Sequence, residues 1–390
     1  DGNNCTLDAC VNHACAHENI PASCNMDADS DGVTDSVDVC PNTPPRTAVD
    51  TQGRPLGDID MDCDTDLVDF ALFGKGFTGP LALPLMVPIP AGDFQMGDSF
   101  GEGNPDELPR HLVHVDSFFM DRYEVTNQQY ADALNWAKNQ GNLITVTSGV
   151  VYKYNSGTSD PYCDTTTSSS YSRITWNGST FGVVAGKENH PMVQVSWYGA
   201  AAYANWRSGM EGRTPSYDTT TWACNFDANG YRLPTEAEWE KAARGGASGH
   251  RFPWSDSDTI QHARANYYSY SDANYPYDTS PTEGSHPTFN TGVYPYTSPV
   301  GYFAPNGYGL YDMAGNVWEW VNDWYGDYPS GPQTNPRGPA IGQYGAYRVL
   351  RGGSWDHHAD GLRCAGRGSY VPPDHRSYDD NGFRLALDSE

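Results

Sequence analysis

The chain has 390 residues, 49 of them acidic and 23 basic, which gives a formal net charge of −26 and length enough for one large domain with smaller modules. Nucleic acid is excluded as a partner because a phosphate backbone requires a basic surface that this composition does not supply. No run of about 18 apolar residues occurs, and no membrane span is therefore expected.

The first 85 residues are rich in cysteine and acid and hold few large apolar side chains. Such coreless, cysteine-dense segments are typical of disulfide modules made in an oxidising compartment. Residues 1–26 are similar to short cysteine-rich repeats of secreted bacterial proteins, and the pairing of their four cysteines stays open. Because Asp1 follows no charged and apolar leader, we expect that an export signal has been removed and that the protein is secreted or lies at the cell surface. The cysteines of this part are Cys5, Cys10, Cys15, Cys24, Cys40 and Cys63.

Residues 27–76 contain two acidic loops with the ligand spacing of a calcium site. Carboxylates at alternate positions converge on one hard cation, and Gly32 in the first loop permits the sharp turn, whereas Cys63 takes that position in the second. The predicted ligands are Asp27, Asp29, Asp31, Val33, Asp35 and Asp38 in the first loop and Asp58, Asp60, Asp62, Asp64, Asp66 and Asp69 in the second. The loops resemble thrombospondin type 3 or dockerin-like repeats, in which a disulfide between Cys40 and Cys63 would join them. The alternative is a solvated acidic linker.

Residues 77–85 form the expected linker, and the large domain then runs from 86 to 390. Thr126 with Gln129, and Thr235 with Glu238, form two capping boxes, and Ser196 can cap an alanine-rich run, so three helices are predicted. Segments 113–120 and 347–351 alternate or run apolar as short strands do. Most of the rest is rich in Gly, Pro, Asn and Tyr without a period. We therefore expect an α+β domain with a high irregular content.

Several motifs of the large domain occur in a fixed order. Residues 231–240 read YRLPTEAEWE, residues 306–320 read NGYGLYDMAGNVWEW, residues 351–355 read RGGSW and residues 382–385 read GFRL. In this order they resemble the formylglycine-generating enzyme (sulfatase-modifying factor) family over about three hundred residues. The resemblance implies a C-type-lectin-like architecture in which long loops are held in part by bound calcium.

The resemblance also implies two calcium sites in the large domain. One would use two carboxylates and main-chain carbonyls, a suitable oxygen cage for a hard ion. Its residues are Asp312, Gly315, Val317 and Glu319. The other would begin at Asn266 and Tyr267, but the segment that should complete it departs from the family pattern. Glu319 stands between two tryptophans, and we expect it to be a semi-buried carboxylate that needs a cation or an arginine.

The family's oxidase needs two cysteine thiolates, which hold Cu(I) and activate oxygen to convert a substrate cysteine to formylglycine. In this chain His357 stands at the first thiol position, and the shortened interval before Cys364 removes the place of the second. Copper is therefore not expected as a cofactor, and calcium is. The large domain has three cysteines, Cys163, Cys224 and Cys364. Because this number is odd, the simplest expectation is one disulfide and one free thiol.

Polar and aromatic residues decorate the C-terminal part between the fixed family positions. They resemble the ligand-facing surface of lectin-type members, including the variable proteins of diversity-generating retroelements, and Tyr and His suit such a surface. The candidate ligand-binding residues are Asp356, His357, His358, Asp360, Tyr370, Asp374, His375 and Tyr378. Zinc held by the two histidines is a weaker alternative, because this spacing rarely closes a tetrahedral site.

Three hypotheses follow. The first is a secreted, calcium-binding protein whose family domain is not catalytic and which self-associates into a filament or coat or binds an extracellular protein or glycan. The second is a lectin-like receptor with its ligand on the 356–380 surface. The third, a copper-dependent oxidase, is disfavoured by the missing thiols.

Overall fold

The computed structural model describes residues 86–270 and 275–389. The predicted cysteine-rich module, both acidic loops and the Cys40–Cys63 disulfide lie outside the described residues. The chain divides into two units, Asp1–Leu83 and Pro84–Glu390, and every element named below belongs to the second. In the described residues no helix is long and apolar enough to cross a membrane.

The three predicted helices form where their caps predict them. Helix α2 (Asn127–Asn139) begins after Thr126, whose hydroxyl accepts a hydrogen bond from the Gln129 amide at 3.2 Å while the Gln129 side chain accepts from the Thr126 amide at 2.9 Å. Helix α4 (Glu236–Ala243) begins with the same reciprocal arrangement, and α3 (Trp197–Met210) begins at Ser196. Each cap satisfies amides that the first helical turn leaves without a partner.

The central sheet has the strand order β15-β14-β12-β16. Its strands are β12 (Trp318–Trp324), β14 (Arg348–Arg351), β15 (Arg367–Val371) and β16 (Asn381–Gly382), so the predicted strand at 347–351 is confirmed. Strand β12 pairs antiparallel with β14 and parallel with β16.

The predicted strand at 113–120 is wrong as a single element. The structure breaks it into β3 (His111–Val115) and β4 (Phe118–Asp121), which belong to different sheets. Strand β3 pairs with β2 (Gly92–Met96) and β13 (Gln333–Thr334), whereas β4 pairs with β1 (Met86–Ile89) and β17 (Ala386–Asp388). At the break the Asp116 amide donates to Asn335 Oδ1 at 2.8 Å, a contact across the sequence that local patterns do not encode.

The remaining elements are short and lie between long loops. One three-stranded sheet and two two-stranded sheets contain β5 (Ile144–Thr147), β6 (Val150–Lys153), β7 (Pro161–Asp164), β8 (Ile174–Trp176), β9 (Phe181–Val183), β10 (Tyr268–Ser269) and β11 (Gly284–Ser285). A 3-10 helix, η2, spans Pro105–Glu107. This mixture confirms the expected α+β class with a large irregular fraction.

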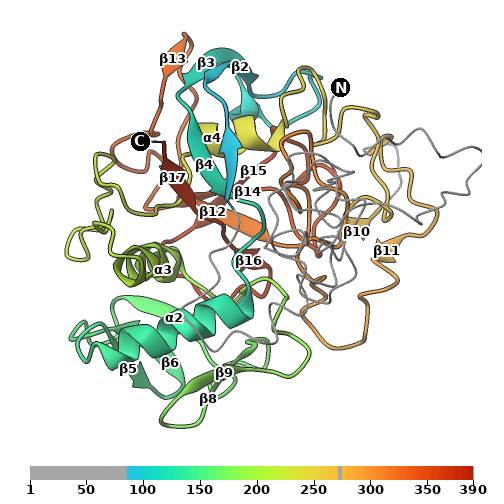
Figure 1. Cartoon of the computed structure of the whole chain (residues 1–390). Coiled ribbons are helices and arrows are strands. Elements are labelled where there is room, and N and C mark those ends of the chain that lie inside the picture. Colours follow the sequence, from blue (N-terminus) through green and yellow to red (C-terminus); the bar gives the residue numbers. More distant parts are fainter. Residues whose placement is uncertain (1–85, 271–274, 390) are drawn as a thin grey trace, which may run out of the picture. The chain divides into compact units, whose positions relative to one another are not determined.

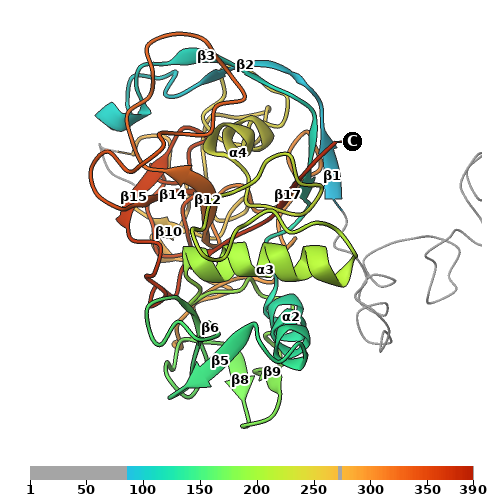
Figure 2. The same cartoon turned by 90° about the vertical axis from the view of Figure 1, so that its left-hand side faces the viewer.

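The helices organise two parts of the core. Helix α4 lies between the β2–β3 strands and the central sheet, and α3 crosses the domain between the central sheet and α2 (Figures 1 and 2). Trp197, Trp239 and Trp320 are fully buried in these layers. At Gly199 an added Cβ would lie 2.2 Å from the Tyr162 carbonyl oxygen, so only glycine lets α3 approach β7 this closely.

Candidate functional site

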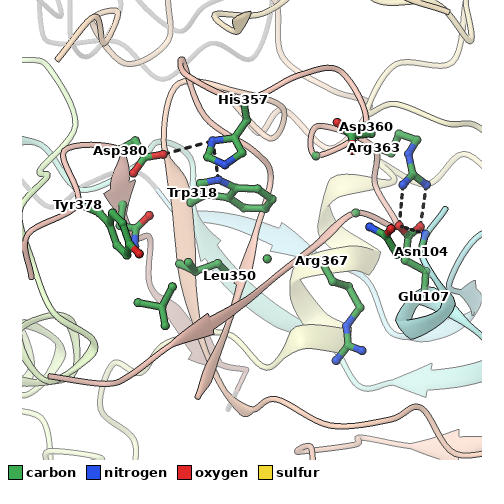
Figure 3. A pocket seen from close by; sticks show the side chains of 15 residues that line it. Asn104, Glu107, Trp318, Leu350, His357, Asp360, Arg363, Arg367, Tyr378 and Asp380 are labelled. Carbon is green, nitrogen blue, oxygen red and sulfur yellow. Dashed lines mark hydrogen bonds and ion pairs between the residues drawn. The ribbon is translucent and has the colours of Figure 1, made fainter. Parts of the chain in front are cut away.

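A cavity of about 360 Å³ opens over one face of the central sheet, beside the loop that follows Ser354 (Figure 3). Trp318 of β12, Leu350 of β14 and Gly368 of β15 lie in its wall. A Cβ at Gly368 would lie 2.9 Å from the Leu350 Cβ and 3.2 Å from the Trp318 ring, so glycine makes room for the indole. Neighbouring strands thus build an aromatic and aliphatic floor for the cavity.

Three side chains converge on one imidazole nitrogen of His357 at the rim. The Trp318 Nε1–H donates to His357 Nδ1 at 3.0 Å, and Ser354 Oγ lies 2.8 Å from the same nitrogen. Ser354 Oγ also donates to Asp380 Oδ2 at 2.9 Å, and that carboxylate oxygen lies 3.3 Å from His357 Nδ1 (Figure 3). The rim is therefore a preformed polar cluster.

This cluster is not a serine nucleophile relay. In such a relay the base uses one ring nitrogen for the serine and the other for the carboxylate. In this structure Ser354 and Asp380 both approach Nδ1 of His357, and an indole N–H can only donate, so Nδ1 acts as an acceptor. Ser354 is fully buried. The arrangement positions the imidazole and does not activate a hydroxyl.

The arginines of the cavity wall are already paired. Arg363 makes a bidentate ion pair with Glu107 at 2.6 and 2.7 Å, and Arg367 makes one with Glu236 at 2.6 and 2.9 Å. Burial raises the pKa of Glu107, although Arg363 opposes this. The carboxylates balance the charge of both guanidinium groups and occupy the Nη1 and Nη2 donors of Arg363, whose Nε is buried without a hydrogen-bond partner among the described residues.

None of the described cysteines lines the cavity. The predicted disulfide among Cys163, Cys224 and Cys364 is wrong, because all three are free thiols at separate places in the fold. Burial raises the pKa of Cys224 and of Cys364 to about 12 each, and it raises that of Cys163 as well. The described thiols are therefore protonated at neutral pH.

The predicted ligand-binding residues divide into separate groups. His357, Asp360 and Tyr378 line the cavity. His358 instead packs among the rings of Tyr268, Tyr270 and Tyr275, with centroids 5.4 to 5.6 Å away. Asp356, Asp374 and His375 do not line the cavity, and the side chain of Tyr370 lies outside the described part of the structure.

Sequence reasoning did not place the residues that close the cavity from distant segments. Asn104 and Glu107 come from the loop around η2, more than two hundred residues before Trp318, and Asn381 comes from β16. The motif pattern singled out none of the three as a ligand residue. Arg363 is a position that matches the family, and it needs a partner for its buried charge. That need is the one sequence signal that could have pointed to Glu107 in the cavity wall.

The predicted calcium residues of the large domain come together around a buried acidic cluster. Asp312 Oδ2 accepts from the Gly301 amide at 2.6 Å, while its Oδ1 is buried with no hydrogen-bond partner among the described residues. Burial raises the pKa of Asp312 to about 6. The Gly301 amide and the charge of Arg384 oppose this rise, and the charge of Glu319 adds to it. Glu319 has the arginine partner that the sequence called for, since Arg384 holds it at 2.7 and 2.8 Å.

Glu124 is a third carboxylate of this cluster that the sequence did not indicate. It accepts from Asn316 Nδ2 at 2.6 Å and from the Val317 amide at 3.3 Å. Burial, and then the charges of Asp312 and Glu319, raise the pKa of Glu124 well above its usual value. A divalent cation beside these carboxylates would relieve their repulsion.

Asn266 is joined to the same cluster through Asn316, whereas the Tyr267 side chain contacts Asp278 and His262. The Asn316 amide donates to the Asn266 carbonyl at 2.8 Å, and Asn266 Oδ1 is buried without a partner in the described structure. The Tyr267 hydroxyl donates to Asp278 at 2.6 Å. Among the described residues no three His, Cys, Asp or Glu side chains are grouped so that they alone could hold a metal ion. A calcium ion here would have to take main-chain and amide oxygens as well.

Comparisons with known proteins agree with this geometry. A family model described as a sulfatase-modifying factor enzyme 1-like domain matches residues 75–389. The formylglycine-generating enzyme of Streptomyces coelicolor is 34% identical over 336 residues, which cover 80% of this chain and 93% of the relative. A Bos taurus relative named inactive C-alpha-formylglycine-generating enzyme 2 is 31% identical over 318 residues, 77% of this chain and 87% of that protein.

A solved structure extends the likeness to the fold. Variable protein 1 of Treponema denticola superposes with a TM-score of 0.51 at 26% identity, covering 78% of this chain and 95% of its own. The motif order, the α+β architecture with long loops and these matches all indicate the same family. The chain belongs to the sulfatase-modifying factor (formylglycine-generating enzyme-like) family.

Proposed function

We propose that this protein is a ligand-binding member of the family that does not carry out the thiol-dependent oxidation, and that its ligand occupies the cavity over Trp318. The observation that carries the proposal is His357, which stands where the resemblance places the first thiol and is hydrogen-bonded to Trp318 and Ser354. The shortened loop leaves no second thiol, and the described cysteines lie elsewhere. A concave site with an apolar floor and a few fixed polar groups is the usual form of a small-ligand site.

The first prediction concerns the oxidation itself. Incubated with Cu(I), oxygen and a cysteine-containing peptide, the protein is expected to form no aldehyde and to bind no copper tightly, because soft thiolate ligands are missing. Mass spectrometry of the peptide measures the product, and the Streptomyces coelicolor enzyme assayed in parallel is the positive control. Aldehyde formation within about tenfold of that control, roughly 1.4 kcal/mol in the barrier, would refute the proposal.

We also propose that calcium holds the loops around Asp312 and Glu319. When bound, it would supply positive charge to the buried carboxylates. The support is the buried and unpartnered Asp312 Oδ1 and the nearby Glu124, which fit a hard cation with oxygen ligands.

The second prediction is a loss of stability on chelation. Removing calcium from a site held at about 100 times its Kd costs roughly 2.7 kcal/mol, so the unfolding midpoint should fall by about 5 °C. The variant Asp312→Asn retains the acceptor for Gly301 and should lose most of this calcium response. The predicted calcium loops in residues 27–76 are unchanged in the variant. The fall in unfolding midpoint of the parent on chelation, minus that of the variant, therefore measures the contribution of the large-domain site. Equal shifts in both proteins would contradict a site at Asp312.

Secretion and an extracellular partner belong to the same proposal. They are supported by the cysteine-dense first 85 residues and by the two acidic loops. An extracellular protein, a glycan or further copies of the chain are the partners that this setting offers.

A further inference from the structure

We infer that the cavity over Trp318 binds a cationic head group, an ammonium or a guanidinium, that carries a hydrogen-bond acceptor beside it. The inference rests on the proposed function, since it names the chemistry of the ligand for the same cavity. Three independent observations support it: the charge balance of the wall, the indole floor and an unpartnered amide.

The charge balance of the wall is negative once its ion pairs are counted. Arg363 and Arg367 are each held by a carboxylate in a bidentate pair. Asp360 and Asp380 also line the cavity, and among the described residues neither has a lysine or arginine partner. Figure 3 places these two carboxylates on opposite sides of His357 and Trp318. A cation in the cavity would therefore meet uncompensated negative charge, whereas an anion would meet guanidinium groups whose charge is already balanced by carboxylates.

Trp318 provides a second reason to expect a cation. Its Nε1–H is already donated to His357, so the indole offers the cavity its ring and not a further donor. Indole is the aromatic group that attracts a cation most strongly, and the attraction grows when the site is shielded from water. Trp318 is 6% exposed, so a head group that reaches it leaves most of its water behind.

Asn381 explains why the ligand should also carry an acceptor. Asn381 lines the cavity, the residue is 3% exposed, and its Nδ2 has no hydrogen-bond partner among the described residues. A buried donor without a partner is energetically costly and is commonly satisfied by a bound group. A carbonyl or hydroxyl oxygen next to the cationic head group would satisfy it.

The protein as a whole favours the same sign of ligand. A net charge of −26 attracts cations and repels anions over distances up to about a Debye length, roughly 8 Å at physiological salt. This effect raises the association rate, while the cavity residues decide which cation is retained.

Calorimetric titration of the full-length protein with matched probes tests the inference. N-acetyl-arginine amide represents a side chain in a peptide, agmatine represents a free small molecule, and N-acetyl-citrulline amide is the neutral isostere. At least one cationic probe is expected to bind about tenfold or more tightly than citrulline, which is the usual scale for one well-placed charge. The tighter of the two cationic probes identifies the source of the head group.

Charge variants locate the binding. Asp360→Asn and Asp380→Asn are each expected to weaken the cationic probe by about tenfold, and Asn at position 380 keeps an acceptor for Ser354. Asp227→Asn, an exposed residue that does not line the cavity, removes the same charge and should leave affinity unchanged. Thermal unfolding of each variant shows that it is folded, and Asn381→Leu should weaken binding without any change of charge.

The outcomes separate the inference from the proposed function. Equal binding of citrulline and arginine probes, or cationic binding unaffected by either carboxylate variant, would overturn the inference. If the neutral probe or an N-acetyl-glutamate amide binds at least as tightly as both cationic probes, and this binding is lost in Trp318→Phe, the inference is overturned while the cavity remains a ligand site. If no probe of any charge binds at millimolar concentration, both the inference and the proposed ligand site fail.

Discussion

Replacing Arg384 with methionine is expected to destabilise the domain by about 3–5 kcal/mol, the usual cost of breaking a buried ion pair from one side. Arg384 is fully buried, and it donates to both carboxylate oxygens of Glu319 at 2.7 and 2.8 Å and to the Tyr311 carbonyl at 2.8 Å. The change would leave Glu319 with the Trp239 indole and no cation from the protein, next to two further carboxylates. Urea unfolding in the presence of calcium measures the loss.

A double-variant cycle identifies the cause. Glu319→Gln together with Arg384→Met removes both charges, so its cost should be smaller than the sum of the two single changes by about 1 kcal/mol or more. Arg110→Met, at an exposed arginine, should change stability by less than about 0.5 kcal/mol. Strict additivity of the two single changes would show that the pair is not what stabilises this region.

The second large effect is a dependence of stability on pH that originates at Asp323 in β12. Burial, and then the charge of Glu236, raise the pKa of Asp323 from 3.8 to about 8, although the Glu236 amide donates to it at 3.0 Å. The folded protein therefore binds this proton more tightly than the unfolded chain does. Between pH 4 and pH 8 the stability should fall as the pH rises, and the loss should level off above the folded pKa.

Asparagine at position 323 is the matched variant, because it resembles the protonated carboxyl and can still accept from the Glu236 amide. The stability of Asp323→Asn relative to the parent protein should rise by at least about 2 kcal/mol between pH 5 and pH 8, since each unit of pKa shift corresponds to 1.36 kcal/mol. Chemical unfolding at both pH values measures this difference, and the exposed Asp327→Asn is the control. Parallel pH profiles for Asp323→Asn and the parent would show that Asp323 is ionised in the fold without penalty.

The sequence predicted the features that depend on neighbouring residues. The caps at Thr126, Ser196 and Thr235 each lie within a turn of the amides that they satisfy, so a short pattern encodes them. The loss of the thiol at His357 is likewise a local fact, read at a fixed distance from a glycine turn. The order of the motifs was enough to indicate the family that the comparisons then showed.

Other predictions depended on contacts between distant segments. The expected single strand at 113–120 is broken by a contact with Asn335, and the expected disulfide is replaced by three separate free thiols. The candidate ligand face divided because His358 turns into a group of tyrosines while His357 binds Trp318. None of these partners lies close in sequence.

By itself the sequence determined the family, the helix starts and the absence of the oxidase thiols from their usual positions, because each follows from residue type at a fixed local spacing. Only the tertiary structure decided that Glu107 closes the wall of the cavity, that Glu124 joins the acidic cluster and that Arg384 neutralises Glu319. These partners are brought together by the packing of loops, and burial then gives their charges consequences that no local pattern records.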